Sequence, residues 1–209
     1  MIEIICNKIS LYFKKELNME EEDREVIEYG LFAVIGSIFK IIMLIILGFI
    51  FGILKYILIL SFSFALFRIF SGGVHSSTYK GCMIISLSIF TLFSVLIKIF
   101  EKNINYNIFS ILSLSIIIHS LYMIINFVPN DNQNRIIKDE LEKKKFKKLT
   151  LYLLVIYVFA MIIAVYFKVS YSLILSGFIG IFLQMISVYP KAYIVMNKFD
   201  NKLKGGILK

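Results

Sequence analysis

The stretch "INYNIFSILSLSIIIHSLYMIINFV", residues 104–128, decides the fold class. It contains no Asp, Glu, Lys or Arg, and an α-helix needs about 20 predominantly apolar residues to cross a bilayer. The stretch therefore predicts a transmembrane helix. His119 lies in its middle, where we expect a packed, hydrogen-bonded histidine, with a proton-relay role as the alternative.

The composition extends this prediction to the whole chain. Of 209 residues 59% are hydrophobic, the mean hydropathy is +0.83, and there are only 2 Pro. These values are not those of a soluble domain. We predict an all-α integral membrane protein with about six transmembrane helices, five being the alternative count. The expected spans are 31–54, 56–70, 82–98, 104–128, 149–167 and 169–190.

The N-terminal residues 1–17 place apolar side chains at helical spacing, with Asn and Lys between them. This pattern predicts an amphipathic helix lying in the membrane interface. The charged residues that follow interrupt any signal-peptide core, so no cleavable signal is expected. We predict one domain, 1–209, made of a cytoplasmic amphipathic and acidic segment (1–28), a transmembrane bundle (31–190) and a basic cytoplasmic tail (191–209).

The distribution of lysine and arginine predicts the orientation. If both termini are cytoplasmic, 18 of the 23 basic residues lie on the cytoplasmic side and 4 lie outside. We therefore expect a multi-pass protein of the cell membrane with both ends cytoplasmic. The block "EKKKFKKL", residues 142–149, either anchors on anionic lipid, at about 1 kcal/mol per basic residue, or docks an acidic peptide. Nucleic acid is not an expected partner.

A second stretch, "FRIFSGGVHSSTYKGCMIIS", residues 67–86, carries the candidate chemistry on the predicted cytoplasmic side. A cysteine thiolate is a nucleophile, and a nearby imidazole can accept and return its proton. In a continuous helix His75 and Cys82 would lie about 10.5 Å apart along the axis, so a break between them is required. We expect Cys82 to open the next helix, where the helix dipole and Lys80 favour the thiolate. On these residues alone, a buried structural cysteine remains the alternative.

Three neighbouring residues are candidate supports. Gly72 and Gly73 allow positive φ and close backbone approach, either at an oxyanion site or at an ordinary helix–loop boundary. Arg68 either extends to the interface or faces a cavity. With two distant cysteines and two histidines, no disulfide framework, metal site or cofactor is expected.

The run "R-I-F-S-G-G-V-H", followed by Cys seven residues after the His, resembles the signature of the accessory gene regulator B (AgrB) family. The resemblance covers nearly the whole length, including about six spans and a basic cytoplasmic loop after the fourth. That loop, "NFVPNDNQNRIIKDELEKKKFKK", has Arg135 where family members often have a second proline.

The resemblance implies a membrane cysteine endopeptidase of Gram-positive quorum sensing. Its substrate is an AgrD-like precursor with an amphipathic leader and an acidic C-terminal tail. His75 is then the general base and Cys82 the nucleophile that forms an acyl-enzyme, which a thiol or hydroxyl of the precursor resolves into a thiolactone or lactone. We expect the N-terminal helix to meet the leader. The residues expected to dock the acidic tail are Lys143, Lys144, Lys145, Lys147 and Lys148.

Two other classes stay open at this stage. A small transporter or exporter of a peptide or ion would use Lys40, His119 and Arg68 as pathway residues. A non-enzymatic membrane scaffold predicts no reactive thiol. The apolar surfaces are consistent with a homodimer and equally with lipid contact.

Overall fold

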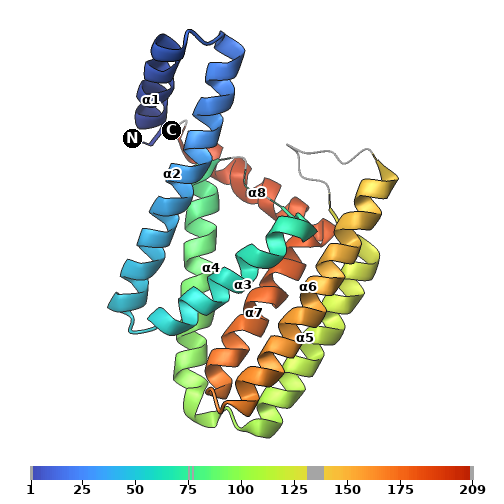
Figure 1. Ribbon diagram of the computed structural model, residues 1–209. Helices are drawn as coiled ribbons and strands as arrows, with labels where there is room; N and C mark the ends of the chain where they lie inside the picture. Colours follow the sequence, from blue (N-terminus) through green and yellow to red (C-terminus); the bar gives the residue numbers. More distant parts are fainter. Residues whose placement is uncertain (1, 75, 77, 131–138, 208–209) are drawn as a thin grey trace. The chain divides into compact units, whose positions relative to one another are not determined.

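The computed structural model describes residues 2–74, 76, 78–130 and 139–207. His75, Arg135 and Lys138 lie outside these ranges. Within them the regular structure is helical (Figure 1), as predicted, and no strand occurs. The elements are α1 (Ile2–Leu17), α2 (Glu21–Ile50), α3 (Leu54–Ser71), α4 (Tyr79–Phe100), the 3-10 turn η1 (Glu101–Asn103), α5 (Tyr106–Phe127), α6 (Glu140–Tyr166), α7 (Tyr171–Val188) and α8 (Pro190–Ile207).

Six of the described helices are long and apolar enough to cross a bilayer, which confirms the predicted count. They are α2, α3, α4 with η1, α5, α6 and α7. Several of them begin earlier than the hydropathy pattern indicates. The first spanning helix starts at Glu21 rather than 31, because the acidic side chains in its first turn favour the positive end of the helix dipole. It ends just before Gly52, whose φ of +63° terminates the helix in the left-handed region.

The chain divides into two compact units, Met1–Ile46 and Leu47–Lys209. In the first unit, the predicted amphipathic helix is present as α1. Arg24 of α2 pairs with Glu21 and Glu28, and its Nη1 donates to Ser10 Oγ of α1 at 3.2 Å. This ion-pair network joins α1 to the start of α2. The interfacial position of α1 stays a prediction.

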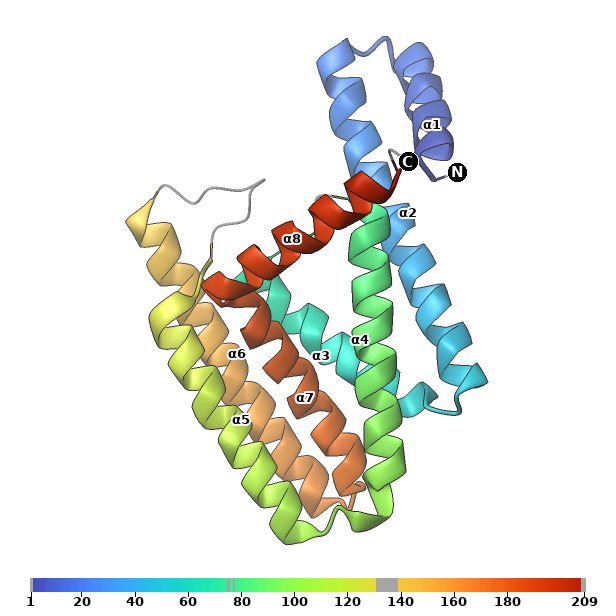
Figure 2. The same cartoon turned by 180° about the vertical axis from the view of Figure 1, so that it is seen from behind.

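In the second unit, α7 is the central helix. It packs most extensively on α3 and then on α5, and Figures 1 and 2 show it between these helices. Close approach depends on small residues, as is common between membrane helices. A Cβ added at Gly180 would lie 2.3 Å from Leu60 O, and one at Gly177 would lie 2.0 Å from the Tyr157 hydroxyl. A larger residue at Gly180 would force α3 away from α7, and one at Gly177 would displace the Tyr157 side chain of α6.

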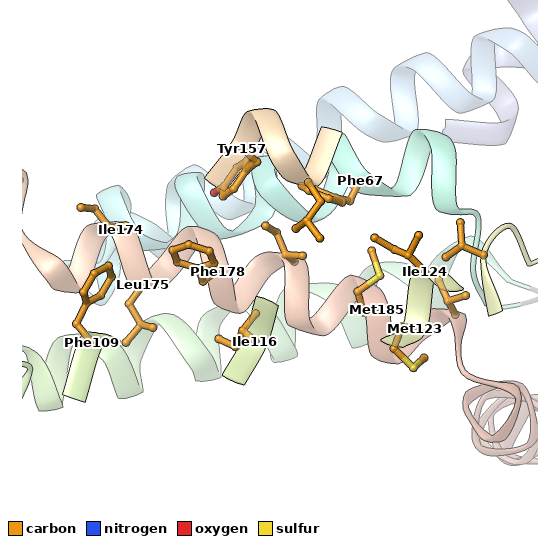
Figure 3. Close-up of a cluster of buried hydrophobic side chains, with 14 residues drawn as sticks. Phe67, Phe109, Ile116, Met123, Ile124, Tyr157, Ile174, Leu175, Phe178 and Met185 are labelled. Carbon is orange, nitrogen blue, oxygen red and sulfur yellow. The ribbon is translucent and has the colours of Figure 1, made fainter. Parts of the chain in front are cut away.

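The core of the second unit is an apolar cluster around α7 (Figure 3). Phe67 of α3, Tyr157 of α6 and Phe178 of α7 meet there edge to face. The outward faces of the spanning helices carry exposed Ile, Leu and Phe side chains. In a bilayer these side chains face lipid, which explains why so many large apolar side chains are exposed.

The C-terminal residues form a helix where the sequence predicted only a basic tail. Tyr189 has extended backbone, and Pro190 opens α8, a position that tolerates proline because its N–H is not needed. Figure 2 shows α8 leaving the end of α7 at a steep angle. This geometry returns α8 to the side of the bundle where α3 ends and α4 begins.

Candidate active site

The break between α3 and α4 that the chemistry requires is present. Helix α3 ends at Ser71, the chain runs through two positive-φ glycines, and α4 starts at Tyr79. Gly72 has φ +70° and ψ −141°, and its N–H donates to Arg68 O as the C-cap of α3. Gly73 has φ +118°. Both glycines therefore use the positive φ that glycine allows.

The backbone at these glycines is closely approached, and the approaching groups belong to the protein itself. A Cβ at Gly72 would lie 2.4 Å from Asn130 O, and one at Gly73 would lie 2.5 Å from Ser187 Oγ. Asn130 N–H donates to Ser71 O at 3.2 Å, forming a single bridge beside Gly72. The two glycines thus let the chain after α5 and the end of α7 contact this turn.

Gln184 of α7 is the centre of the hydrogen bonding around the turn. Its side chain is fully buried, and its Nε2 donates to Ser71 Oγ at 2.8 Å and to Gly72 O at 2.7 Å. Its Oε1 accepts from Ser187 Oγ at 3.2 Å. A buried amide needs such partners. Sequence reasoning missed Gln184, although an amide within an apolar span is itself a marker of a functional or structural site.

Arg68 supports the segment next to position 75. From the last turn of α3 its Nη2 donates to Val74 O at 2.5 Å and its Nη1 to Gln184 Oε1 at 3.4 Å. Its guanidinium also lies 5.6 Å from the centre of the Phe64 ring, a cation–π contact. Val74 N–H in turn donates to Ser187 O at 2.9 Å. Of the two expectations for Arg68, the contacts favour a side chain directed inward.

Cys82 lies in the first turn of α4, as predicted, although the helix begins three residues before it. Thr78 is the N-cap: its side chain accepts from Gly81 N–H at 3.1 Å, and its carbonyl accepts from Cys82 N–H at 3.0 Å. Cys82 is partly exposed, whereas Cys6 is fully buried. The two backbone donors at Gly81 and Cys82 are used inside the protein.

Cys6, the other cysteine of the chain, lies in an environment that disfavours the thiolate form. Burial, and then the nearby Glu28 carboxylate, raise the pKa of the Cys6 thiol. A raised pKa lowers the thiolate fraction near neutral pH and with it the reactivity. Cys6 therefore serves as an internal comparison for Cys82.

The segment after Val74 is held by α8. Ser76 Oγ donates to Asp200 Oδ1 at 2.6 Å, and both residues are buried. His75 lies outside the described residues, so its approach to Cys82 stays a prediction. The described residues that flank it, Val74 and Ser76, are anchored to α3, α7 and α8.

The basic block differs from the expected loop, because it is helical. Asp139 caps α6 by accepting from Leu141 N–H at 2.9 Å, and acidic residues occupy the first turn. Two of the five lysines have partners: Lys143 pairs with Glu140 at 3.6 Å, and Lys147 donates to Ile125 O. The exposed ones are Lys144, Lys145 and Lys148.

Two of the residues proposed for a transport pathway, His119 and Lys40, lie in different compact units of the chain. The His119 ring packs against Phe182 at 5.1 Å between centroids, as expected for a packed histidine. Its Nε2, however, has no hydrogen-bond partner among the described residues, so the hydrogen bond predicted for it is not seen at this atom. Lys40 belongs to α2 in the other compact unit.

Comparisons with known proteins show which family the chain belongs to. The family model for accessory gene regulator B matches residues 6–188. An AgrB-like protein of Clostridium perfringens (strain SM101 / Type A) is 32% identical, covering 97% of this chain and 100% of its own length. An AgrB-like protein of Clostridium beijerinckii is 30% identical, covering 97% of this chain and 96% of its own length.

A more distant relative carries the family name itself. The accessory gene regulator protein B of Staphylococcus aureus (strain MRSA252) is 24% identical over 90% of this chain and 94% of its own. No solved structure matches the chain. The family model and the clostridial relatives show that this chain belongs to the accessory gene regulator B family.

Proposed function

We propose that the protein is a membrane cysteine endopeptidase that removes the C-terminal tail of an AgrD-like precursor and promotes its cyclisation. Membership of the AgrB family supports a role in the processing of accessory gene regulator quorum-sensing peptides, together with an AgrD precursor. Six apolar helices and the same family membership support a multi-pass membrane protein. The orientation of the termini stays the cytoplasmic one that the basic residues predict.

The observation that carries the proposal is the setting of Cys82. It is a partly exposed thiol in the first turn of α4, directly after a segment that three other helices hold in place. A helix N-terminus favours the thiolate form of a cysteine. The other cysteine of the chain, Cys6, is buried and unsuited to this chemistry.

The proposed reaction is an acyl transfer in two steps. Cys82 Sγ attacks the carbonyl carbon that precedes the acidic tail, and its proton passes through His75 to the leaving amine as the C–N bond breaks. The acyl group is then a thioester on Cys82. A thiol or hydroxyl within the precursor attacks this thioester, closes a thiolactone or lactone, and releases the Cys82 thiol. No cofactor is needed, and a site sheltered by the membrane favours ring closure over hydrolysis.

We assign Arg68, Gly72 and Gly73 to holding the active-site turn rather than to contacting the oxyanion. Gly72 N–H already donates to Arg68 O, and the space around both glycines is filled by Asn130 and Ser187. Because the Gly72 N–H already donates inside the protein, it is a poor donor to a developing charge. These residues act on catalysis through the geometry of the turn.

The exposed lysines of α6 are proposed to attract the acidic tail of the precursor. Lys144, Lys145 and Lys148 lie on the exposed surface of the first turns of the helix. Such charges act mainly on encounter and affinity, and salt screens them. Replacing these three by Glu is expected to weaken precursor cleavage most at low salt, whereas Lys102→Glu, an exposed lysine of η1, is the matched control. Equal cleavage by both variants would remove the docking role.

The direct test is co-expression with the candidate precursor and mass analysis of the peptides formed. We expect the parent protein and Cys6→Ala to release the tail, and Cys82→Ala and His75→Ala to release none while still inserting into the membrane. Cleavage by Cys82→Ala would reject the proposal. Transport of an uncleaved peptide by Cys82→Ala would instead support the transporter alternative.

A further inference from the structure

Asp200 is an acidic residue in an unexpected place. It lies on α8 within a basic sequence, yet only 5% of it is exposed. Burial of a carboxyl group is costly unless hydrogen bonds compensate it. Asp200 Oδ1 accepts from the Ser76 hydroxyl at 2.6 Å, a hydrogen bond that offsets part of this cost.

A chain of hydrogen bonds connects Asp200 with the first turn of α4. The Ser76 hydroxyl donates to Asp200 Oδ1, and the same oxygen of Ser76 accepts from Thr78 N–H at 3.3 Å. Thr78 is the N-cap, and its carbonyl accepts from Cys82 N–H at 3.0 Å. A hydroxyl that donates to a carboxyl group becomes a better acceptor, so the bonds in such a chain strengthen one another.

The segment around position 75 is held on both sides by hydrogen bonds from other helices. Arg68 and Ser187 hold the segment at Val74, on one side of position 75. Asp200 holds it at Ser76, on the other side. The direction in which α4 starts, and with it the position of Cys82, depends on both ends of this short segment.

We propose that Asp200 is a positioning residue of the active site, which acts through Ser76 and Thr78 on the start of α4. The proposal rests on the proposed peptidase function, because the position of Cys82 matters only if its thiol reacts. It makes α8 a part of the active site rather than only a basic tail. The carboxyl group does not take part in bond making itself.

The test compares substitutions that remove the hydrogen bond with substitutions that keep it. Asp200→Ala and Ser76→Ala remove it, whereas Asp200→Asn keeps an acceptor oxygen and Ser76→Thr keeps the hydroxyl. All variants are made in a Cys6→Ala background, so that Cys82 is the only thiol. Two rates are measured: cleavage of the precursor, and alkylation of Cys82 by iodoacetamide without precursor.

We expect Asp200→Ala and Ser76→Ala to slow cleavage about 10- to 100-fold, the range of a lost hydrogen bond to a charged group, and to change the alkylation rate. Asp200→Asn and Ser76→Thr should recover much of both rates. The double variant Asp200→Ala/Ser76→Ala should be slowed by clearly less than the product of the two single defects, because the hydrogen bond between the two side chains is lost in both single variants.

Two outcomes overturn the proposal: cleavage by Asp200→Ala at the parent rate, or a double variant whose defect is the product of the single defects. If Asp200→Ala does not fold, the comparison of Ser76→Ala with Ser76→Thr decides alone. Failure of the proposed function is a separate result, because cleavage by Cys82→Ala rejects the peptidase assignment. The alkylation rates still report in that case whether Asp200 positions the thiol.

Discussion

Gly72→Ala is the substitution whose effect follows most directly from the geometry. Gly72 has φ +70° and ψ −141°, a region in which an L-residue costs about 1–3 kcal/mol. The new Cβ would also lie 2.4 Å from Asn130 O, a backbone atom that cannot rotate away. Moving Asn130 breaks its bond to Ser71 O, for about 1 kcal/mol more.

Gly72→Ala is therefore expected to destabilise the native turn by about 2–4 kcal/mol. The turn before α4 should distort to relieve part of this strain. Since each 1.36 kcal/mol is a factor of ten, we expect precursor cleavage to fall by at least about tenfold. Gly30→Ala is the matched control, because Gly30 lies in α2 with nothing within 4 Å of an added Cβ. That change should be neutral or stabilise the helix by up to about 1 kcal/mol.

The assay is precursor cleavage together with thermal unfolding of both variants in detergent. Loss of cleavage by Gly72→Ala, with Gly30→Ala cleaving at the parent rate, would support the positive φ of Gly72 and its close contact with Asn130 O. Cleavage and thermal stability of Gly72→Ala equal to those of the parent would show that the turn is not held as the structure has it.

Three further predictions concern other parts of the structure. Because burial and then Glu28 raise the pKa of Cys6, its alkylation at neutral pH should be slower than that of an unfolded-chain cysteine and should rise only at higher pH, which peptide mass spectrometry of labelled protein measures. Gln184→Leu leaves Gly72 O without the Gln184 donor, so the free energy of unfolding in detergent should fall by about 1–3 kcal/mol and precursor cleavage should slow. Unchanged stability and cleavage would contradict the role of Gln184 as the centre of hydrogen bonding around the turn. Tyr157→Phe removes a 2.6 Å bond to a serine hydroxyl of α3, and unfolding should show a loss of about 0.6 kcal/mol at unchanged cleavage.

The sequence predicted the helical membrane class and the number of spans, because the length of each apolar run is a local property. It predicted helix starts less well. Charged first turns, as at Glu21 and at Glu140, lie outside the apolar run and yet are helical, since acidic side chains favour a helix N-terminus. Hydropathy measures where a helix enters lipid, and this differs from where the helix begins.

At the candidate site, the sequence predicted the elements that are local and missed those that come from elsewhere in the chain. The left-handed glycines and the position of Cys82 in the first turn of α4 follow from neighbouring residues. Gln184, Asn130 and Asp200 reach the turn from α7, from the end of α5 and from α8. Their contacts depend on how the helices pack, and one sequence does not contain that information beyond the polar character of Gln184 in an apolar helix.

The measurement that tests the central claim most directly is the detection of the acyl-enzyme. Detergent-solubilised protein in the Cys6→Ala background is mixed with precursor, quenched in acid and analysed as intact protein and as peptides by mass spectrometry. We predict a thioester adduct on the peptide that contains Cys82, with an added mass equal to that of the tail-less precursor minus one water, and its loss with hydroxylamine. Release of the tail without any adduct on Cys82, or an adduct of the same mass in Cys82→Ala, would contradict Cys82 as the nucleophile.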